Sequence, residues 1–311
     1  MSATDPSPPR RRPILRRRWS GSSRPDGRRG ALVERITTVA AMRAFGRVSR
    51  AAGRRIGLVP TMGALHRGHL SLIERARSEC DAVVVSIYVN PLQFGPKEDF
   101  RAYPRDLERD QGLLRSSGTD ALFVPEHEEI HVPGHRTRVE VQGMQDVLCG
   151  RSRPGHFRGV ATVVAKLFAI VRPDIACFGE KDAQQLRIIR RMALDLHDET
   201  QIISCPTVRE EDGLALSSRN TYLTPEERRA APVLYRALRS AAASGRAGET
   251  DAARLVSLAR DTIAREPLAR LDYVEAVDGE TLEPVATAGA GTLLAVAAWF
   301  GRARLIDNIS F

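Results

Sequence analysis

The chain has 311 residues, of which 42% are hydrophobic and 27% charged, values typical of a folded protein with room for two domains. No stretch approaches the roughly 20 apolar residues that a membrane-spanning helix needs, so we expect a soluble protein without a membrane partner. The four cysteines are far apart, with no C-x-x-C pair and no zinc-type spacing to histidine. The sequence therefore predicts neither a disulfide framework nor a structural zinc, and a cytoplasmic location fits.

Most of the net charge of +9 is concentrated at the N-terminus. Residues 1–30 hold nine Arg against two Asp, which is +7 and leaves only +2 for the other 281 residues. This stretch lacks a periodic apolar pattern, so residues 1–33 are predicted to form a disordered Arg-rich tail. An extended start is favoured over an organelle transit peptide. Because the body is nearly neutral, we do not expect nucleic acid as a partner, although an Arg-rich arm that binds phosphate backbones is the alternative from a different functional class.

Short apolar runs alternate with amphipathic segments through residues 34–207. The expected strands are 56–59, 82–89, 121–124 and 175–178, and the expected helices are 70–80, 160–171 and 184–196. In the first helix an apolar stripe should pack on the sheet, formed by Leu70, Ile73, Ala76 and Cys80. The alternation predicts an α/β fold with a doubly wound parallel sheet.

The pattern changes after about residue 208. Ala- and Arg-rich segments at 225–244 and 250–265 read as helices, and 271–277 and 291–298 read as strands. Residues 208–311 are therefore predicted to form a smaller α+β domain.

The first candidate site is the segment 60–69, which follows the first of the alternating strands. Ligands of open parallel sheets bind beyond the carboxyl ends of the strands. Gly63 and Gly68 permit close approach of a ligand, and the helix that begins near Arg67 offers free N–H groups to phosphate. His66 and His69 could direct two imidazole donors at one anion. The alternatives are a helix-capping histidine beside an exposed one, or a metal pair, for which no third ligand is near.

The second candidate site is the segment 178–185, again a strand end followed by a helix start. Lys181 is one of only three lysines in the chain, and a compact ammonium suits phosphate. Asp182 and Gln185 could accept from or donate to a ligand. The alternative is an N-capping Asp182 beside a solvated Lys181.

A third polar segment follows the turn at 212–213. Ser217, Ser218 and Arg219 supply two hydroxyls and a guanidinium, a plausible clamp for pyrophosphate oxygens. The alternative is an ordinary surface turn.

Two further segments could line the same crevice. Asn90 and Gln93 follow a strand end and could bind a small polar substrate through their amides, unless they form only an Asn-Pro turn. Residues 151–159 form either a second anion site or a basic surface loop.

Together and in this order, these segments resemble the pantothenate synthetase family of H-x-G-H nucleotidyltransferases. The shared motifs are P-T-M-G-A-L-H-x-G-H, V-N-P-L-Q-F-G, R-P-G-H-F-R-G-V, F-G-E-K-D and L-S-S-R-N, and the likeness runs from about Ile36 to Phe311. The resemblance implies a Rossmann-like domain that binds ATP and pantoate, a C-terminal lid domain and a homodimer. It also implies condensation of pantoate with β-alanine through a pantoyl-adenylate, with ATP as substrate and Mg²⁺ as cofactor.

The resemblance also implies roles for particular residues. The catalytic residues would be His66, His69 and Lys181. The ATP-binding residues would be Met62, His66, His69, Gly179, Lys181, Asp182, Val208, Ser217, Ser218 and Arg219. Pantoate would contact Met62, Gln93 and Gln185, and Asp110 would bind the metal. Cys149 departs from the pattern, because some relatives carry Glu there, so no role of that carboxylate is transferred.

The implied chemistry agrees with these residue types. A carboxylate with a pKa near 4 is already ionised at neutral pH and needs no general base to attack the α-phosphorus of ATP. Positioning and charge neutralisation are what the protein must supply. The alternative within enzymes is another H-x-G-H nucleotidyltransferase, which would adenylate a different acid or phosphate.

Overall fold

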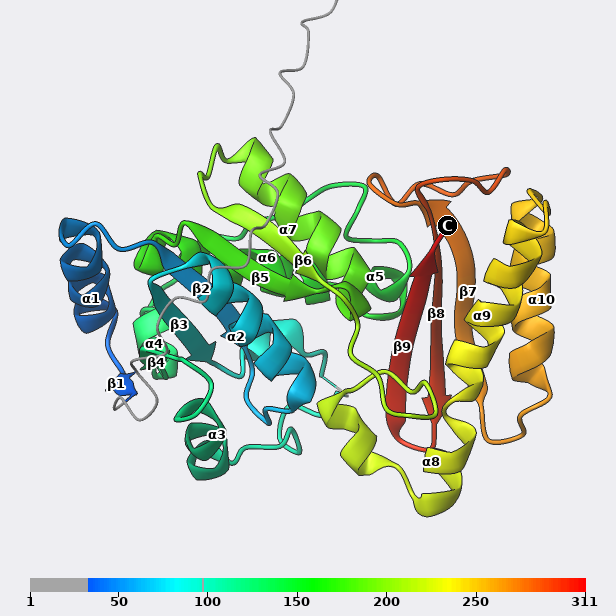
Figure 1. The fold of residues 1–311 in the computed structure, drawn as a ribbon, viewed down its shortest axis with the longest axis horizontal. Helices are drawn as coiled ribbons and strands as arrows, with labels where there is room; N and C mark the ends of the chain where they lie inside the picture. The colour runs from blue at the N-terminus through cyan, green and yellow to red at the C-terminus, as the bar shows by residue number, and fades with distance from the viewer. Residues whose placement is uncertain (1–32, 97) are drawn as a thin grey trace, which may run out of the picture.

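The computed structural model describes residues 33–96 and 98–311 (Figure 1). The tail predicted at residues 1–33 lies outside this range, apart from residue 33. The described chain forms a six-stranded parallel sheet in its first part and a three-stranded antiparallel sheet in its second.

The six-stranded sheet has the order β1-β4-β3-β2-β5-β6, and each strand pair is parallel. Its strands are β1 Glu34–Ile36, β2 Ile56–Thr61, β3 Ala82–Ile87, β4 Ala121–Phe123, β5 Ile175–Gly179 and β6 Gln201–Cys205. From β2 the chain builds outward to β3 and β4, then returns to β2 and builds the other way through β5 and β6. The doubly wound prediction is confirmed, and the topological switch point lies between β2 and β5.

Helices cover both faces of this sheet (Figure 1). The longer ones are α1 Val39–Ala51, α2 Arg67–Glu79, α3 Leu107–Leu114, α6 His156–Val171 and α7 Ala183–Asp195. Alternate residues of β2 serve opposite faces. Ile56 and Leu58 share a core with α1, α6 and α7, whereas Val59 shares another with α2 and α3.

Short turns connect these elements near the strand ends. They are the helices α4 His127–Ile130 and α5 Cys149–Ser152 and the 3₁₀ turns η1 Pro91–Gln93, η2 Glu180–Asp182 and η3 Ser218–Tyr222. The sequence patterns did not predict them, because three to five residues are too few to show a period.

The second part of the chain consists of α8 Pro225–Ala230, α9 Val233–Arg246, α10 Ala252–Ala264, β7 Arg270–Asp278, β8 Thr292–Phe300 and β9 Ala303–Ser310. One face of its sheet packs against α9 and α10. The other face joins the core of the first part through residues that include Tyr273, Leu293 and Ala295. The single helix predicted at 225–244 is wrong, because Pro232, which has no N–H, separates α8 from α9.

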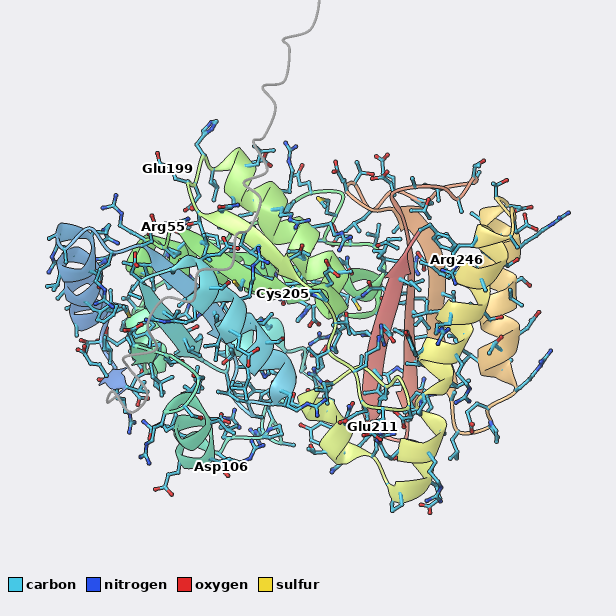
Figure 2. The ribbon with its side chains drawn as sticks, viewed as in Figure 1. Arg55, Asp106, Glu199, Cys205, Glu211 and Arg246 are labelled. Atoms are coloured by element: carbon cyan, nitrogen blue, oxygen red, sulfur yellow. The ribbon has the colours of Figure 1, made fainter. Side chains whose placement is uncertain are left out.

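The predicted buried stripe of α2 is partly wrong. Ile73, Ala76 and Cys80 are buried as expected, but Leu72 takes the place of Leu70, which is only half-buried. Asp110 and Asp307 are buried, whereas the charged residues labelled in Figure 2 are exposed: Arg55, Asp106, Glu199, Glu211 and Arg246.

Gly159 makes a close contact that holds η1 against the first turn of α6. A Cβ atom at this position would lie 2.2 Å from the carbonyl oxygen of Leu92. We therefore expect Gly159→Ala to lower the free energy of unfolding by about 1–3 kcal/mol, the usual effect of overpacking, in urea denaturation. Gly112→Ala is the matched control, because nothing lies within 4 Å of its added Cβ and helix α3 should gain up to about 1 kcal/mol. Equal stability of the two variants would contradict the prediction.

Candidate active site

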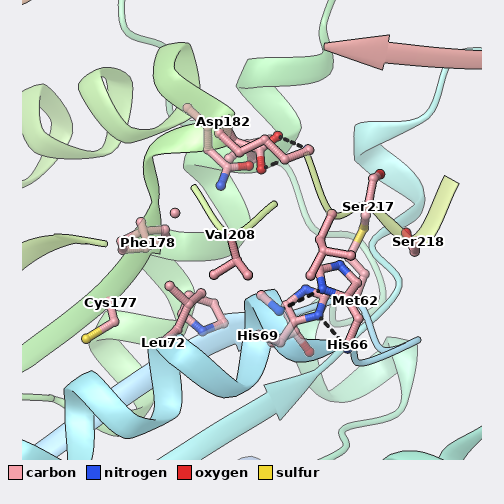
Figure 3. Close-up of a pocket in the computed structure, with 18 of the residues that line it drawn as sticks. Met62, His66, His69, Leu72, Cys177, Phe178, Asp182, Val208, Ser217 and Ser218 are labelled. Carbon is pink, nitrogen blue, oxygen red and sulfur yellow. Dashed lines mark hydrogen bonds and ion pairs between the residues drawn. The ribbon is translucent and has the colours of Figure 1, made fainter. Parts of the chain in front are cut away.

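A pocket of about 210 Å³ opens at the switch point, beyond the carboxyl ends of β2 and β5 (Figure 3). The pocket is lined by the N-terminus of α2, by η2 and by the segments 206–208 and 216–219. Twelve of the residues singled out from the sequence line it: Met62, His66, His69, Gln93, Gly179, Lys181, Asp182, Gln185, Val208, Ser217, Ser218 and Arg219. Segments up to about 155 residues apart in the chain therefore meet in one cavity.

The two histidines cap the N-terminus of α2. His66 Nδ1 accepts from the Gly68 N–H at 3.1 Å, and His69 Nδ1 accepts from the His66 N–H at 3.3 Å. Each neutral ring must then carry its proton on Nε2. The ring centroids are 4.1 Å apart, and both side chains line the pocket (Figure 3). Helix capping and ligand donation, which the sequence presented as alternatives, are compatible because they use opposite ring nitrogens.

Both histidines are held neutral. Burial and the positive charge of Lys181 together lower the pKa of His66 to about 4. Burial, with His66 and Lys181 nearby, lowers the pKa of His69 to about 3. At neutral pH they offer N–H donors to an anion and contribute no net charge.

Lys181 brings an ammonium group to the pocket. Its Nζ lies 3.4 Å from each carboxylate oxygen of Asp182. Asp182 occupies the N-cap position of α7 but its side chain makes no capping hydrogen bond, so the side-chain capping expected in the alternative is wrong. Asn308 of β9 donates to the carbonyl oxygens of Glu180 and Lys181 at 2.9 and 3.0 Å. The second sheet therefore fixes the backbone that carries this lysine.

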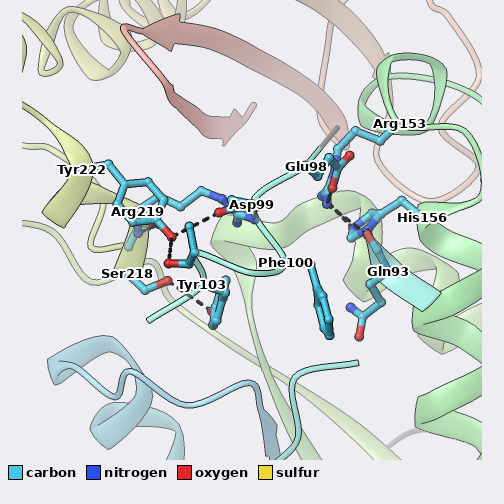
Figure 4. Close-up of polar contacts among 12 residues, drawn as sticks. Gln93, Glu98, Asp99, Phe100, Tyr103, Arg153, His156, Ser218, Arg219 and Tyr222 are labelled. Atoms are coloured by element: carbon cyan, nitrogen blue, oxygen red, sulfur yellow. Dashed lines mark hydrogen bonds and ion pairs between the residues drawn. The ribbon is translucent and has the colours of Figure 1, made fainter. Parts of the chain in front are cut away.

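The segment 217–219 reaches the pocket from the second part of the chain. Ser217 Oγ accepts from the Arg219 N–H at 3.2 Å, and Ser218 Oγ lies 3.2 Å from the Tyr103 hydroxyl. The Arg219 guanidinium donates to Asp99 at 3.1 Å (Figure 4). The ordinary-turn alternative is wrong for these residues, since they link two distant segments beside the pocket.

The 3₁₀ turn η1 brings Gln93 to the pocket and is supported from α6. The backbone oxygen of Gln93 accepts from His156 Nδ1 at 2.7 Å and from Arg153 Nη2 at 3.2 Å. Arg153 also donates to Glu98 at 2.8 Å (Figure 4). The segment 151–159 is therefore a support for η1. Asn90 is fully buried and donates to the main chain of α6, so the expectation that it binds substrate is wrong.

Asp110 lies outside the pocket lining, behind the histidine loop. Its side chain is 1% exposed, and Oδ1 accepts from the Leu65 N–H at 2.8 Å. Burial raises its pKa. The described residues contain no cluster of three or more His, Cys, Asp or Glu side chains that could hold a metal ion. In this structure Asp110 supports the loop through its backbone contacts, and its metal role stays a prediction.

The sequence of the chain matches a known protein family. The family profile described as Pantoate-beta-alanine ligase matches residues 34–310. The chain belongs to this family. The pantothenate synthetase of Pelotomaculum thermopropionicum is 56% identical over 271 residues, which cover 87% of this chain and 96% of that protein.

Solved structures agree with this assignment. The crystal structure of pantothenate synthetase from Thermus thermophilus has a TM-score of 0.85 at 49% identity, covering 89% of this chain and 99% of that one. The Francisella tularensis pantoate-beta-alanine ligase, complexed with beta-gamma ATP and beta-alanine, has a TM-score of 0.74 at 36% identity, covering 89% and 97%. The fold prediction is confirmed at the level of both sheets.

The chain is thus an ATP-dependent ligase. It condenses pantoate with β-alanine to pantothenate through a pantoyl-adenylate and releases AMP and pyrophosphate. No helix in the described ranges is long and apolar enough to cross a membrane.

Sequence reasoning missed an apolar wall and a tyrosine of this site. The wall comes from one face of α6 and consists of Val160, Val163, Val164 and Leu167. Apolar residues at helical spacing look the same whether they face a core or a pocket, so no local signal distinguishes them. Tyr103, which contacts Ser218, carried no signal of its own.

Because these histidines are neutral in the folded protein, the free energy of unfolding should decrease as the pH is lowered. Their lowered pKa values mean that the unfolded chain binds protons more readily below pH 6.5, so stability is complete above that value and declines as pH falls toward 4. His69→Asn keeps an acceptor for the His66 N–H but does not titrate. We expect it to reduce the loss of unfolding free energy between pH 7 and 5 by about 1 kcal/mol in urea titrations, allowing for partial solvent exposure.

His197→Asn is the matched control for this experiment. His197 is exposed and has a φ of 52°, which Asn tolerates. Its pH dependence should equal that of the wild type. An unchanged slope in His69→Asn would show that His69 does not titrate as inferred.

Proposed function

We propose that both steps of the ligase reaction take place in the switch-point pocket. The observation that carries this proposal is the convergence there of two imidazole Nε2 donors, the Lys181 ammonium and the segment 217–219. These groups are suited to bind phosphate oxygens at a helix N-terminus. The Francisella tularensis ligase, solved in complex with beta-gamma ATP and beta-alanine, supports the choice of substrates for the two steps.

In the first step, the ionised carboxylate of pantoate attacks the α-phosphorus of ATP, and pyrophosphate leaves. Gln93 and Gln185 orient the pantoate through their amides, and Met62 packs beside it. Lys181, Arg219 and the Nε2–H groups of the histidines stabilise the charge that grows on pyrophosphate. Ser217 and Ser218 complete the phosphate clamp, and Gly179, Asp182 and Val208 bind the adenosine.

In the second step, the amine of β-alanine attacks the acyl carbon of the pantoyl-adenylate. The C–N bond forms, the C–O bond to AMP breaks, and the nitrogen releases a proton. The apolar wall from α6 lines the same pocket and limits the access of water, which would otherwise hydrolyse the adenylate.

Other assignments are also proposals. Mg²⁺ would enter with the triphosphate, because the described residues hold no cluster of three or more His, Cys, Asp or Glu side chains that could bind a resident ion. A homodimer in the cytoplasm follows from the family resemblance and the cysteine pattern.

Residues 208–311 would act as a lid over the domain formed by 34–207. A second cavity of about 530 Å³, between η2 and β9, supports this proposal. Cys149 lines that cavity and links the two parts, since its Sγ lies 3.2 Å from the Tyr273 hydroxyl and 3.3 Å from Arg304 Nη1.

The reaction can be tested by omitting one substrate at a time. AMP release should require ATP, pantoate and β-alanine together. Exchange of labelled pyrophosphate into ATP should require pantoate but not β-alanine. Exchange that proceeds without pantoate, or with another acid in its place, would instead favour a different H-x-G-H nucleotidyltransferase.

Removing a phosphate-binding group should slow the first step. We expect Lys181→Ala and His66→Ala each to lower pantoate-dependent pyrophosphate exchange by about 10²-fold or more, as for loss of a key electrostatic donor. Arg254→Ala is the control, because this cation lies exposed on α10. Near-normal exchange by either pocket variant would remove that residue from the mechanism.

A further inference from the structure

A line of hydrogen-bonded polar groups runs behind the pocket from the half-buried Lys166 of α6 to η1. Lys166 Nζ lies 3.2 Å from His131 Nδ1, and His131 Nε2 lies 3.2 Å from Asn90 Oδ1. His131 is 6% exposed and Asn90 is fully buried. None of these three residues lines the switch-point pocket, yet the line ends three residues before Gln93.

The partners at each end fix the protonation of His131. An ammonium can only donate, so His131 Nδ1 must accept from Lys166. The Asn90 amide nitrogen already donates to the Gly159 carbonyl oxygen at 3.1 Å, so the oxygen of that amide faces His131. His131 Nε2 must therefore carry the proton and donate it to Asn90.

The surroundings keep this ring neutral. Burial and the nearby positive charge of Lys166 lower the pKa of His131 to about 4. The other titratable groups that face it are His127, His135, Arg138 and the Tyr88 phenol. Burial also raises the pKa of Tyr88, to a value too high for it to ionise near neutral pH.

Asn90 transmits this orientation to η1. Its Oδ1 also accepts from the Leu92 N–H at 3.3 Å, which caps the turn that carries Gln93. Without a donor on Nε2 of residue 131, the side-chain oxygen of Asn90 loses one of the two hydrogen bonds that it accepts. The turn would then lose part of its fixed position, and misplacing a substrate-binding group by about 1 Å can reduce rates by about 10²-fold.

We propose that His131 is a positioning residue for pantoate, acting through Asn90 on the turn that presents Gln93. The inference rests on the proposed pantoate-binding role of Gln93. Lys166 holds the required tautomer, which gives a function to a second of the three lysines.

Kinetics of three full-length variants test the proposal. His131→Leu removes the donor, whereas His131→Gln keeps an amide that can accept from Lys166 and donate to Asn90. We expect His131→Leu to raise the KM for pantoate about 10-fold in pyrophosphate exchange, with the KM for ATP changed less than about 2-fold, and His131→Gln to restore most of the difference. Gln93→Ala should raise the same KM.

The outcomes distinguish the pantoate-binding role of Gln93 from the positioning role of His131. If Gln93→Ala leaves the KM for pantoate unchanged, the proposed pantoate site is wrong. If Gln93→Ala raises it but His131→Leu does not, the positioning role is overturned. Equal increases in both KM values for His131→Leu, or no rescue by Gln, would indicate a general structural role and would also overturn it.

Lys166→Met gives a second test if His131→Leu does not fold. Without the ammonium, the neutral ring can adopt the Nδ1–H tautomer, in which Nε2 no longer donates to Asn90. We therefore expect Lys166→Met to raise the KM for pantoate in pyrophosphate exchange, with the KM for ATP changed less than about 2-fold. An unchanged KM for pantoate in this variant would contradict the proposed tautomer.

Discussion

The site depends on one topological constraint, the reversal of winding between β2 and β5. These strands are neighbours in the sheet, but more than a hundred residues separate them in the chain. Because they are parallel, their carboxyl ends open on the same edge, and the connections that follow must diverge. The divergence leaves a crevice, and the start of α2 and the turn η2 form its walls.

Charge in this crevice is balanced before any ligand binds. Arg219 is paired with Asp99, and Arg153 is paired with Glu98 (Figure 4). The two carboxylates belong to the segment between η1 and α3. Under the proposed role of Arg219, a triphosphate would have to compete with Asp99 for its guanidinium, so nucleotide binding would rearrange an existing ion pair. Lys181 is less engaged, since its contacts with Asp182 are long at 3.4 Å.

The sequence predicted the parts of this arrangement that are local. Alternating apolar runs predicted the central strands, and the motifs around His66, Lys181 and Ser217 predicted residues that do line the pocket. Strands β1, β6 and β9 were missed, because they are short or interrupted by polar residues. The roles of Asp99 and Tyr103 depend on contacts across more than a hundred residues, which no local pattern encodes. Asn90 was predicted to bind substrate because it follows a strand end. Its buried side chain instead contacts Gly159 and supports η1.

The neutrality of the two histidines has a consequence for turnover. If residues 66 and 69 were cations beside Lys181, they would bind ATP and pyrophosphate with similar strength. Groups that bind the ground state and the transition state equally do not accelerate the chemical step. Neutral N–H donors fixed by backbone hydrogen bonds are instead oriented dipoles, whose effect depends on where the phosphate oxygens lie. The capping box at the start of α2 therefore does more than begin a helix. It sets the tautomer of both rings and leaves their Nε2–H donors available for the phosphate oxygens that we propose they bind.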